Sequence, residues 1–141
     1  MARALHLAGR ALGDPEMSAV AVAALRGVFR RPWPHANLTG PTLCHGEAGL
    51  LQAVLRVTET DRDPVLLAAA GVLAGRILTG FDHQAPFGFR HGHRTRPGGL
   101  VGVDEPGLLQ GAAGVALALA TFARHPGTAG TSTWDSMLLL N

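Results

Sequence analysis

The stretch Gly40-Pro41-Thr42-Leu43-Cys44-His45-Gly46-Glu47-Ala48-Gly49-Leu50-Leu51 carries the pattern from which the fold can be predicted. Its part from Leu43 to Leu51 is echoed by Leu108-Leu109-Gln110-Gly111-Ala112-Ala113-Gly114-Val115-Ala116. In both copies a Gly-x-x-Gly step opens an apolar run typical of a helix. Two such copies predict a structural unit that the chain uses repeatedly.

A second repeated signal marks the helix that follows each unit. Asp14-Pro15 and Asp63-Pro64 both stand before apolar runs, and Asp is a good N-cap while Pro fits the first helical position. The chain therefore predicts a helical hairpin used about three times. Expected inner helices are Ala2–Leu12, closed by Gly13, and residues 46–58 and 107–124; expected outer helices are residues 14–31, 63–81 and the short 134–140.

The composition favours a single all-α domain over residues 1–141. Hydrophobic residues make up 47% of the chain and aromatic ones only 5%, with abundant Gly and Ala. Such a composition suits closely packed helices better than a β-sandwich and argues against disorder. Residues 81–106 read as a long Gly, Pro, His and Arg-rich connection, and loops of this length in compact domains are usually functional or disordered.

Charge and hydropathy disfavour nucleic-acid and membrane functions. The net charge is +2, and the one local basic cluster, Arg90, Arg94 and Arg96, has only Phe87 and Phe89 nearby for stacking. Residues 106–123 lack charge and include Gly107-x-x-x-Gly111, but Gln110 and many small residues favour a buried helix over a membrane span. A single cysteine and no secretory signal predict a cytoplasmic protein without disulfides.

Cys44-His45 is the pair of residues with the clearest chemistry. A thiolate and an imidazole are good zinc ligands, and a turn before a helix can aim both at one ion. Composition alone favours another interpretation, a small buried cysteine beside a capping histidine. His91 and His93 could complete a four-ligand set, although a solvated Arg-flanked loop is the favoured interpretation for them. Glu47 could hydrogen-bond His45, but a first-turn carboxylate stabilised by the helix dipole is favoured.

Four motifs in order resemble those of lanthionine synthetase C-like proteins. The Cys-His-Gly motif of that family resembles residues 40–50, and its Gly-Leu-Leu-x-Gly-x-Ala-Gly run resembles residues 106–117. Pro86-Phe87-Gly88-Phe89 and Trp134-Asp135-Ser136-Met137-Leu138-Leu139-Leu140 are similar to pieces of the family's C-terminal segment. The resemblance covers essentially the whole chain.

The resemblance implies a partial α/α toroid around a zinc ion. In the family, two cysteines and one histidine hold the zinc, and a peptide cysteine takes the fourth position. The metal turns that thiol into a thiolate, which adds to dehydroalanine or dehydrobutyrine and forms a (methyl)lanthionine thioether ring. Cys44 and His45 match the second cysteine and the histidine. The implied partners are a dehydrated precursor peptide and either a dehydratase or an upstream fragment.

The chain departs from the family pattern at two ligating or reacting positions. The first zinc cysteine, in a Trp-Cys-Tyr-Gly context, would lie upstream of Ala2, and Cys44 is the only cysteine of the chain. The family's acid/base histidine would also lie upstream, so no catalytic residue is assigned here. We therefore expect a C-terminal fragment of a cyclase domain that has little activity alone. The alternative is a non-catalytic helical-repeat module that associates with a partner through the apolar sides of residues 2–12 and 19–28.

Overall fold

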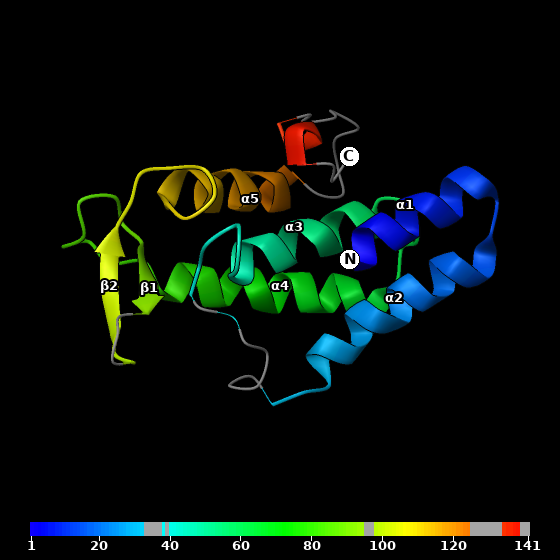
Figure 1. Cartoon of the computed structure of the whole chain (residues 1–141), viewed down its shortest axis with the longest axis horizontal. Coiled ribbons are helices and arrows are strands. Elements are labelled where there is room, and N and C mark those ends of the chain that lie inside the picture. Colours follow the sequence, from blue (N-terminus) through cyan, green and yellow to red (C-terminus); the bar gives the residue numbers. More distant parts are fainter. Residues whose placement is uncertain (33–37, 39, 95–97, 125–133, 139–141) are drawn as a thin grey trace.

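The computed structural model describes residues 1–32, 38, 40–94, 98–124 and 134–138, and within them the chain is mostly helical (Figure 1). The elements are α1 (Ala2–Leu12), α2 (Pro15–Phe29), α3 (Glu47–Thr58), α4 (Pro64–Thr79), β1 (Arg90–Arg94), β2 (Leu100–Asp104), α5 (Ala112–Arg124) and a 3₁₀ helix (Ser136–Leu138). The all-α prediction is confirmed, with one small two-stranded sheet added to it.

The two Asp-Pro pairs start helices as predicted. The Asp14 carboxylate accepts the Met17 backbone N–H at 3.0 Å, with Pro15 at the first helical position. The Asp63 carboxylate accepts the backbone N–H groups of Val65 and Leu66 at 3.0 and 3.1 Å. These bonds satisfy helix donors that have no partner inside the helix. Gly13, at φ 67°, ends α1 in the left-handed conformation that glycine adopts without strain.

Helix α3 lies at the centre of the described helices (Figure 1). It packs against α4 on one side and α5 on another, and α1 also touches it. Leu51, Val54 and Leu55 of α3 are fully buried. The core around them is aliphatic, built from α2, α4 and α5 as well: Leu25, Leu66, Leu73, Ile77, Val115 and Ala118. The hairpin of α1 and α2 projects from one end of this core, and the sheet lies at the other.

Helix α1 buries polar residues rather than its leucines. Arg3, His6 and Gly9 are its buried positions, spaced three apart on one face. The His6 Nε2 contacts the Asp61 carboxylate, and Arg3 Nη1 lies 2.8 Å from His6 Nδ1. Polar contacts thus tie the first helix to the connection between α3 and α4.

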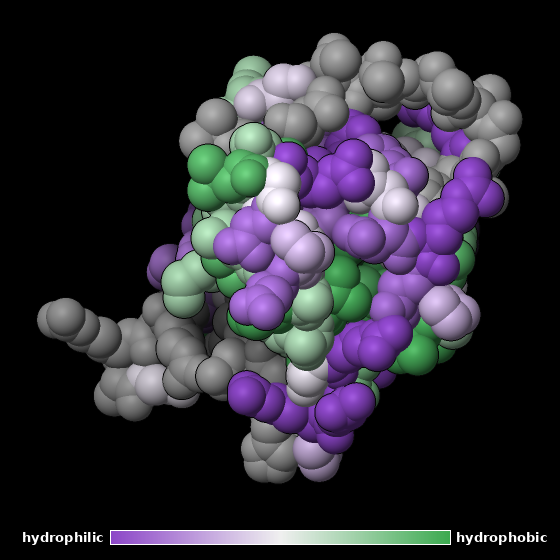
Figure 2. Space-filling view, turned by 90° about the vertical axis from the view of Figure 1, so that its right-hand side faces the viewer, coloured by the Kyte–Doolittle hydropathy of each residue, from purple (hydrophilic) through white to green (hydrophobic). Residues whose placement is uncertain are grey.

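The end of the molecule at which α1 and α2 meet has a mixed surface. Figure 2 shows hydrophilic residues crossing this face, with apolar areas between them. Leu12 and Val20 are 74% and 58% exposed. The expected exposure of apolar residues in the first hairpin is therefore present at these two positions.

The sequence suggested a long connection without regular structure over residues 81–106, but part of it forms a two-stranded sheet. β1 and β2 pair in antiparallel register, with Arg90 opposite Asp104 and His93 opposite Val101. Arg90 binds Asp82 and Asp104, each at 3.1 Å, which secures the start of the hairpin. Before the strands, Phe81 packs edge-on against Phe89, with ring centroids 5.3 Å apart. These contacts give the connection a local structure of its own.

Two helix boundaries also differ from the prediction. Helix α5 begins at Ala112 rather than Gly107, because residues before it form a turn. At the chain's end, a 3₁₀ helix spans Ser136–Leu138 where a helix over 134–140 was expected, and residues 139–140 lie outside the described part. Within the described residues, no helix has the length and hydropathy to cross a membrane.

Candidate metal centre

The turn before α3 folds back onto the start of that helix. The backbone N–H groups of Glu47, Ala48 and Gly49 donate to the carbonyls of Gly40, Pro41 and Thr42 at 2.9, 3.3 and 3.4 Å. The first helical donors, which have no partner within a helix, are satisfied by the chain just before it. This arrangement leaves Cys44 and His45 at the outer bend of the turn, between the two bonded segments.

The repeat predicted from the sequence is confirmed: the turn before α3 has a second copy before α5. Before α5, Ala112 and Ala113 donate to the carbonyls of Glu105 and Pro106 at 2.9 and 3.2 Å. The glycines of both copies allow the close approach: a Cβ would lie 2.2 Å from Gly40 O at Gly46 and 2.0 Å from Leu43 O at Gly49. At Gly111 and Gly114 the corresponding distances are 2.3 and 1.9 Å, to the carbonyls of Glu105 and Leu108. Only glycine fits these four positions.

The turn before α3 and the turn before α5 are joined by a backbone hydrogen bond at Cys44. Cys44 donates its backbone N–H to the carbonyl of Leu109, at 2.8 Å. Cys44 and His45 are both exposed, and Cys44 Sγ lies 3.8 Å from His45 Nε2. The interpretation of Cys44 as a small buried cysteine is therefore wrong. Both donor atoms face the same side of the turn.

The spacing of the two donor atoms suits a shared zinc ion. Zinc binds cysteine sulfur at about 2.3 Å and histidine nitrogen at about 2.0 Å, so two tetrahedral ligands lie about 3.5 Å apart. The observed 3.8 Å is close to that value. The distance between Cys44 Sγ and His45 Nε2 is thus compatible with two of the four positions around one ion.

An open cavity of about 450 Å³ borders the two donor atoms. Cys44 and His45 are the polar side chains among the described residues that line it, and the remaining lining is glycine and leucine. Leu109 of the second turn and Leu138 of the 3₁₀ helix contribute to its wall, so segments far apart in the chain meet here.

Glu47 lies beside the pair but points to another helix. Its Oε1 accepts from Nε of Arg76 in α4 at 3.0 Å, and Arg76 Nη2 lies equally close. This ion pair holds the first turn of α3 against α4. Stabilisation of Glu47 by the helix dipole, and a contact between Glu47 and His45, stay predictions.

His91 and His93 lie on β1 and do not join Cys44 and His45. Their rings contact each other edge-on with centroids 6.4 Å apart. Over the described ranges, no three His, Cys, Asp or Glu side chains gather closely enough to hold a metal ion. All four residues of the alternative set are described, so that set is not assembled in this chain.

A buried ion pair joins the last turn of α3 to the residue before the 3₁₀ helix, and the sequence did not predict it. Asp135, fully buried, accepts from Arg56 Nε and Nη2 at 2.6 Å each and from Gln52 Nε2 at 2.6 Å. Burial acts to raise the pKa of Asp135, but the hydrogen bonds from Arg56 and Gln52 and the Arg56 charge lower it by more. The hydrogen bond to Asp135 raises the pKa of Arg56 in turn. Two polar residues four apart within the apolar α3, Gln52 and Arg56, were the available signal.

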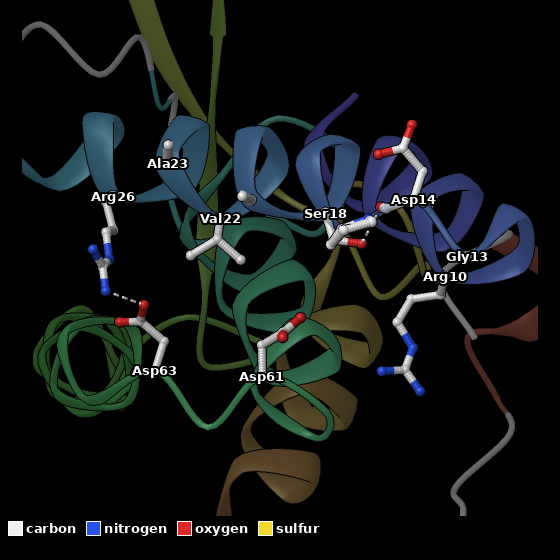
Figure 3. A pocket seen from close by; sticks show the side chains of 12 residues that line it. Arg10, Gly13, Asp14, Ser18, Val22, Ala23, Arg26, Asp61 and Asp63 are labelled. Atoms are coloured by element: carbon white, nitrogen blue, oxygen red, sulfur yellow. Dashed lines mark hydrogen bonds and ion pairs between the residues drawn. The ribbon is translucent and has the colours of Figure 1, made fainter.

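A larger depression of about 680 Å³ lies at the other end of α3 (Figure 3). Arg26 from α2 and Asp63 point toward one another across it and form an ion pair, and Asp61 lies beside them. Neither Cys44 nor His45 lines it. The length of α3, about 18 Å at 1.5 Å per residue, separates the two regions.

Comparison with known families gives one match. A family model described as lanthionine synthetase C-like protein matches residues 1–139. Comparison with curated proteins gives no match. The matched region includes both repeated turns and the 3₁₀ helix that completes the cavity.

Proposed function

The chain belongs to the lanthionine synthetase C-like family, and on that premise we propose that it is part of a zinc-dependent peptide cyclase. The observation that carries this proposal is the pair of exposed donor atoms, Cys44 Sγ and His45 Nε2, 3.8 Å apart beside an open cavity. In the proposal, Cys44 and His45 hold the zinc, and a third ligand comes from a cysteine upstream of this chain. We place the activity in the cytoplasm, where a metal-binding cysteine stays reduced.

The proposed substrate is a dehydrated precursor peptide that carries a cysteine and a dehydroalanine or dehydrobutyrine. Bound zinc would lower the pKa of the peptide thiol and so supply a thiolate at neutral pH. The sulfur bonds to the β-carbon of the dehydro residue, the carbon–carbon double bond opens, and the α-carbon takes up a proton. The product is a thioether ring.

Each part of the chain has a defined task in this proposal. The repeated turn presents Cys44 and His45 to the cavity, and leucine side chains line the space beside them. The group that delivers the proton is assigned to a histidine upstream of this chain. We therefore expect the 141-residue chain alone to cyclise peptides poorly.

Zinc binding by the purified chain tests the proposal. We expect Cys44→Ala and His45→Ala each to weaken zinc affinity by at least about 10-fold, since loss of even an outer-shell partner costs 10- to 100-fold. Competition with a chromophoric chelator measures the affinity. His93→Ala is the matched control, because His93 is an exposed histidine on β1. Unchanged affinity in Cys44→Ala, or equal loss in His93→Ala, would exclude Cys44 and His45 as the site.

A second candidate function is association through α1 and α2. Its basis is the burial pattern described above: α1 buries Arg3, His6 and Gly9, while Leu12 and Val20 remain exposed. Exposed apolar areas on a small protein often mark contact surfaces. In this alternative the chain is a non-catalytic helical module.

A further inference from the structure

The cavity beside Cys44 and His45 is chemically suited to an apolar occupant. Among the described residues that line it, none is charged. The leucines that form its walls are Leu38, Leu43, Leu50, Leu109 and Leu138. A charged or polar group placed against such walls without a hydrogen-bond partner loses free energy on leaving water, whereas an aliphatic group gains it.

The walls of this cavity are fixed by contacts outside it. The carbonyl of Leu109 accepts the Cys44 backbone N–H, which holds the two repeated turns together. Leu138 donates its backbone N–H to the carbonyl of Asp135 at 2.9 Å, and the Asp135 side chain is bound to Arg56 and Gln52. Leu138 is therefore linked, through Asp135, to a buried ion pair on α3.

The size of the cavity suits part of a peptide. A volume of about 450 Å³ falls within the range of roughly 300–1,000 Å³ found for ligand pockets. Consecutive Cα atoms of a peptide lie about 3.8 Å apart. A residue next to a cysteine held at Cys44 and His45 can therefore reach the leucines.

We propose that this cavity binds an apolar side chain that flanks the reacting cysteine of the peptide, an inference that rests on the proposed cyclase function. Leu109 and Leu138 are then specificity-determining residues. Peptides with leucine or a similar residue beside the cysteine are preferred over those with a small polar residue there.

Disulfide exchange at Cys44 tests the preference without metal. Cys44 is the only cysteine of the chain, so every mixed disulfide forms beside the cavity. The chain is equilibrated in a thiol redox buffer with equal amounts of the capped dipeptides Cys-Leu and Cys-Ser, both uncharged, and the adducts are quantified by intact mass spectrometry. We expect the Cys-Leu adduct to exceed the Cys-Ser adduct by at least about 10-fold, as for a missing apolar group in a hydrophobic pocket.

Variants connect that ratio to the leucines. Leu109→Ser, at a position already 45% exposed, and Leu138→Ser should both bring the ratio towards one. Met137→Ser is the matched control, because Met137 neighbours Leu138 but is 73% exposed, and it should leave the ratio unchanged. A ratio near one in the unmodified chain, or an equal change in Met137→Ser, would overturn the inference.

The two proposals fail separately. Zinc affinity that depends on Cys44 and His45, together with no preference for Cys-Leu, would overturn the apolar cavity and leave the cyclase proposal standing. A clear preference for Cys-Leu without zinc affinity would support the cavity and remove the metal site.

Discussion

At the scale of single residues, Asp135 is the charged group that most depends on its surroundings. It is fully buried, and Arg56 binds both of its oxygens while Gln52 binds one. A buried carboxylate is stable only with such partners, since leaving water costs several kcal/mol. The same interaction ties the 3₁₀ helix Ser136–Leu138 to α3, and Trp134 adds a hydrogen bond to Thr121 of α5 at 3.2 Å.

We expect Asp135→Asn to destabilise the fold by roughly 3 kcal/mol, because it leaves the buried Arg56 without its bidentate acceptor. The lower end of the usual range applies, since Arg56 keeps a bond to Glu59 at 2.6 Å. Urea unfolding followed by circular dichroism measures the change. Glu16→Gln, at an exposed position in the first turn of α2, is the control and should change stability little. Equal stability of both variants would contradict the assigned role.

The same carboxylate predicts how stability depends on pH. The pKa of Asp135 is lower in the folded chain than its ordinary value near 4, so unfolding takes up a proton in acid. Its stabilising contribution is complete above about pH 4 and is lost as the pH falls towards the lowered folded value. Asp63 has a lowered pKa too and acts in the same direction. Unfolding free energies measured between neutral pH and pH 3 should therefore fall less steeply in Asp135→Asn.

At the scale of elements, the repeated turn depends on its glycines. The carbonyl of Leu43 approaches Gly49, and that of Leu108 approaches Gly114, more closely than any side chain allows. The turn can therefore fold back onto the helix it precedes, and Cys44 and His45 are presented at its bend. Gly71 of α4 differs, because a Cβ there would meet nothing within 4 Å.

Alanine substitutions at Gly49 or Gly114 and at Gly71 should change the stability of the fold in opposite directions. Gly49→Ala and Gly114→Ala must displace backbone, and we expect a loss of roughly 1–3 kcal/mol or more. Gly71→Ala, inside a helix and exposed, should raise stability by about 0.5–1 kcal/mol, since alanine loses less backbone entropy on folding. Thermal unfolding of the three variants measures the expected loss of stability in the first two and the expected gain in the third. A neutral Gly114→Ala would contradict the close approach in the second turn.

At the scale of the whole molecule, the first hairpin is the part least supported by the apolar core. Helix α2 buries only Ala21 and Leu25, whereas α4 buries six residues along its length. The first hairpin is held partly through polar contacts, His6 with Asp61 and Arg26 with Asp63. Its exposed apolar residues are therefore available for contacts with another polypeptide.

If that surface acts in association, the chain should form larger species as its concentration rises. We expect Leu12→Ser and Val20→Ser to reduce this association, as measured by sedimentation velocity, because each removes an exposed apolar group. Val72→Ser on α4 is the control, since Val72 is equally exposed, at 62%, but lies on another helix. A chain that stays monomeric at every concentration would exclude self-association through this hairpin.

Local signals in the sequence determined much of the helical framework. Asp-Pro pairs start α2 and α4 because capping involves only neighbouring residues, and the Gly-x-x-Gly steps marked both turns before α3 and α5. Cys44 and His45 are adjacent in the chain, so their proximity required no knowledge of the fold. The zinc site itself, with Cys44, His45 and an upstream cysteine as its three protein ligands, stays a prediction.

The tertiary structure alone decided what distant segments do together. The strands β1 and β2 form where Arg90 binds Asp82 and Asp104, and the sequence of β1, Arg-His-Gly-His-Arg, has no strong strand propensity. Asp135 lies 79 positions after Arg56, more than half the length of the chain, and Leu138, three residues beyond Asp135, lines the cavity. Such contacts depend on how the packing of the helices brings separate segments of the chain together. Residue patterns specify helices through nearby bonds, but the cavity arises from long-range packing that no local pattern encodes.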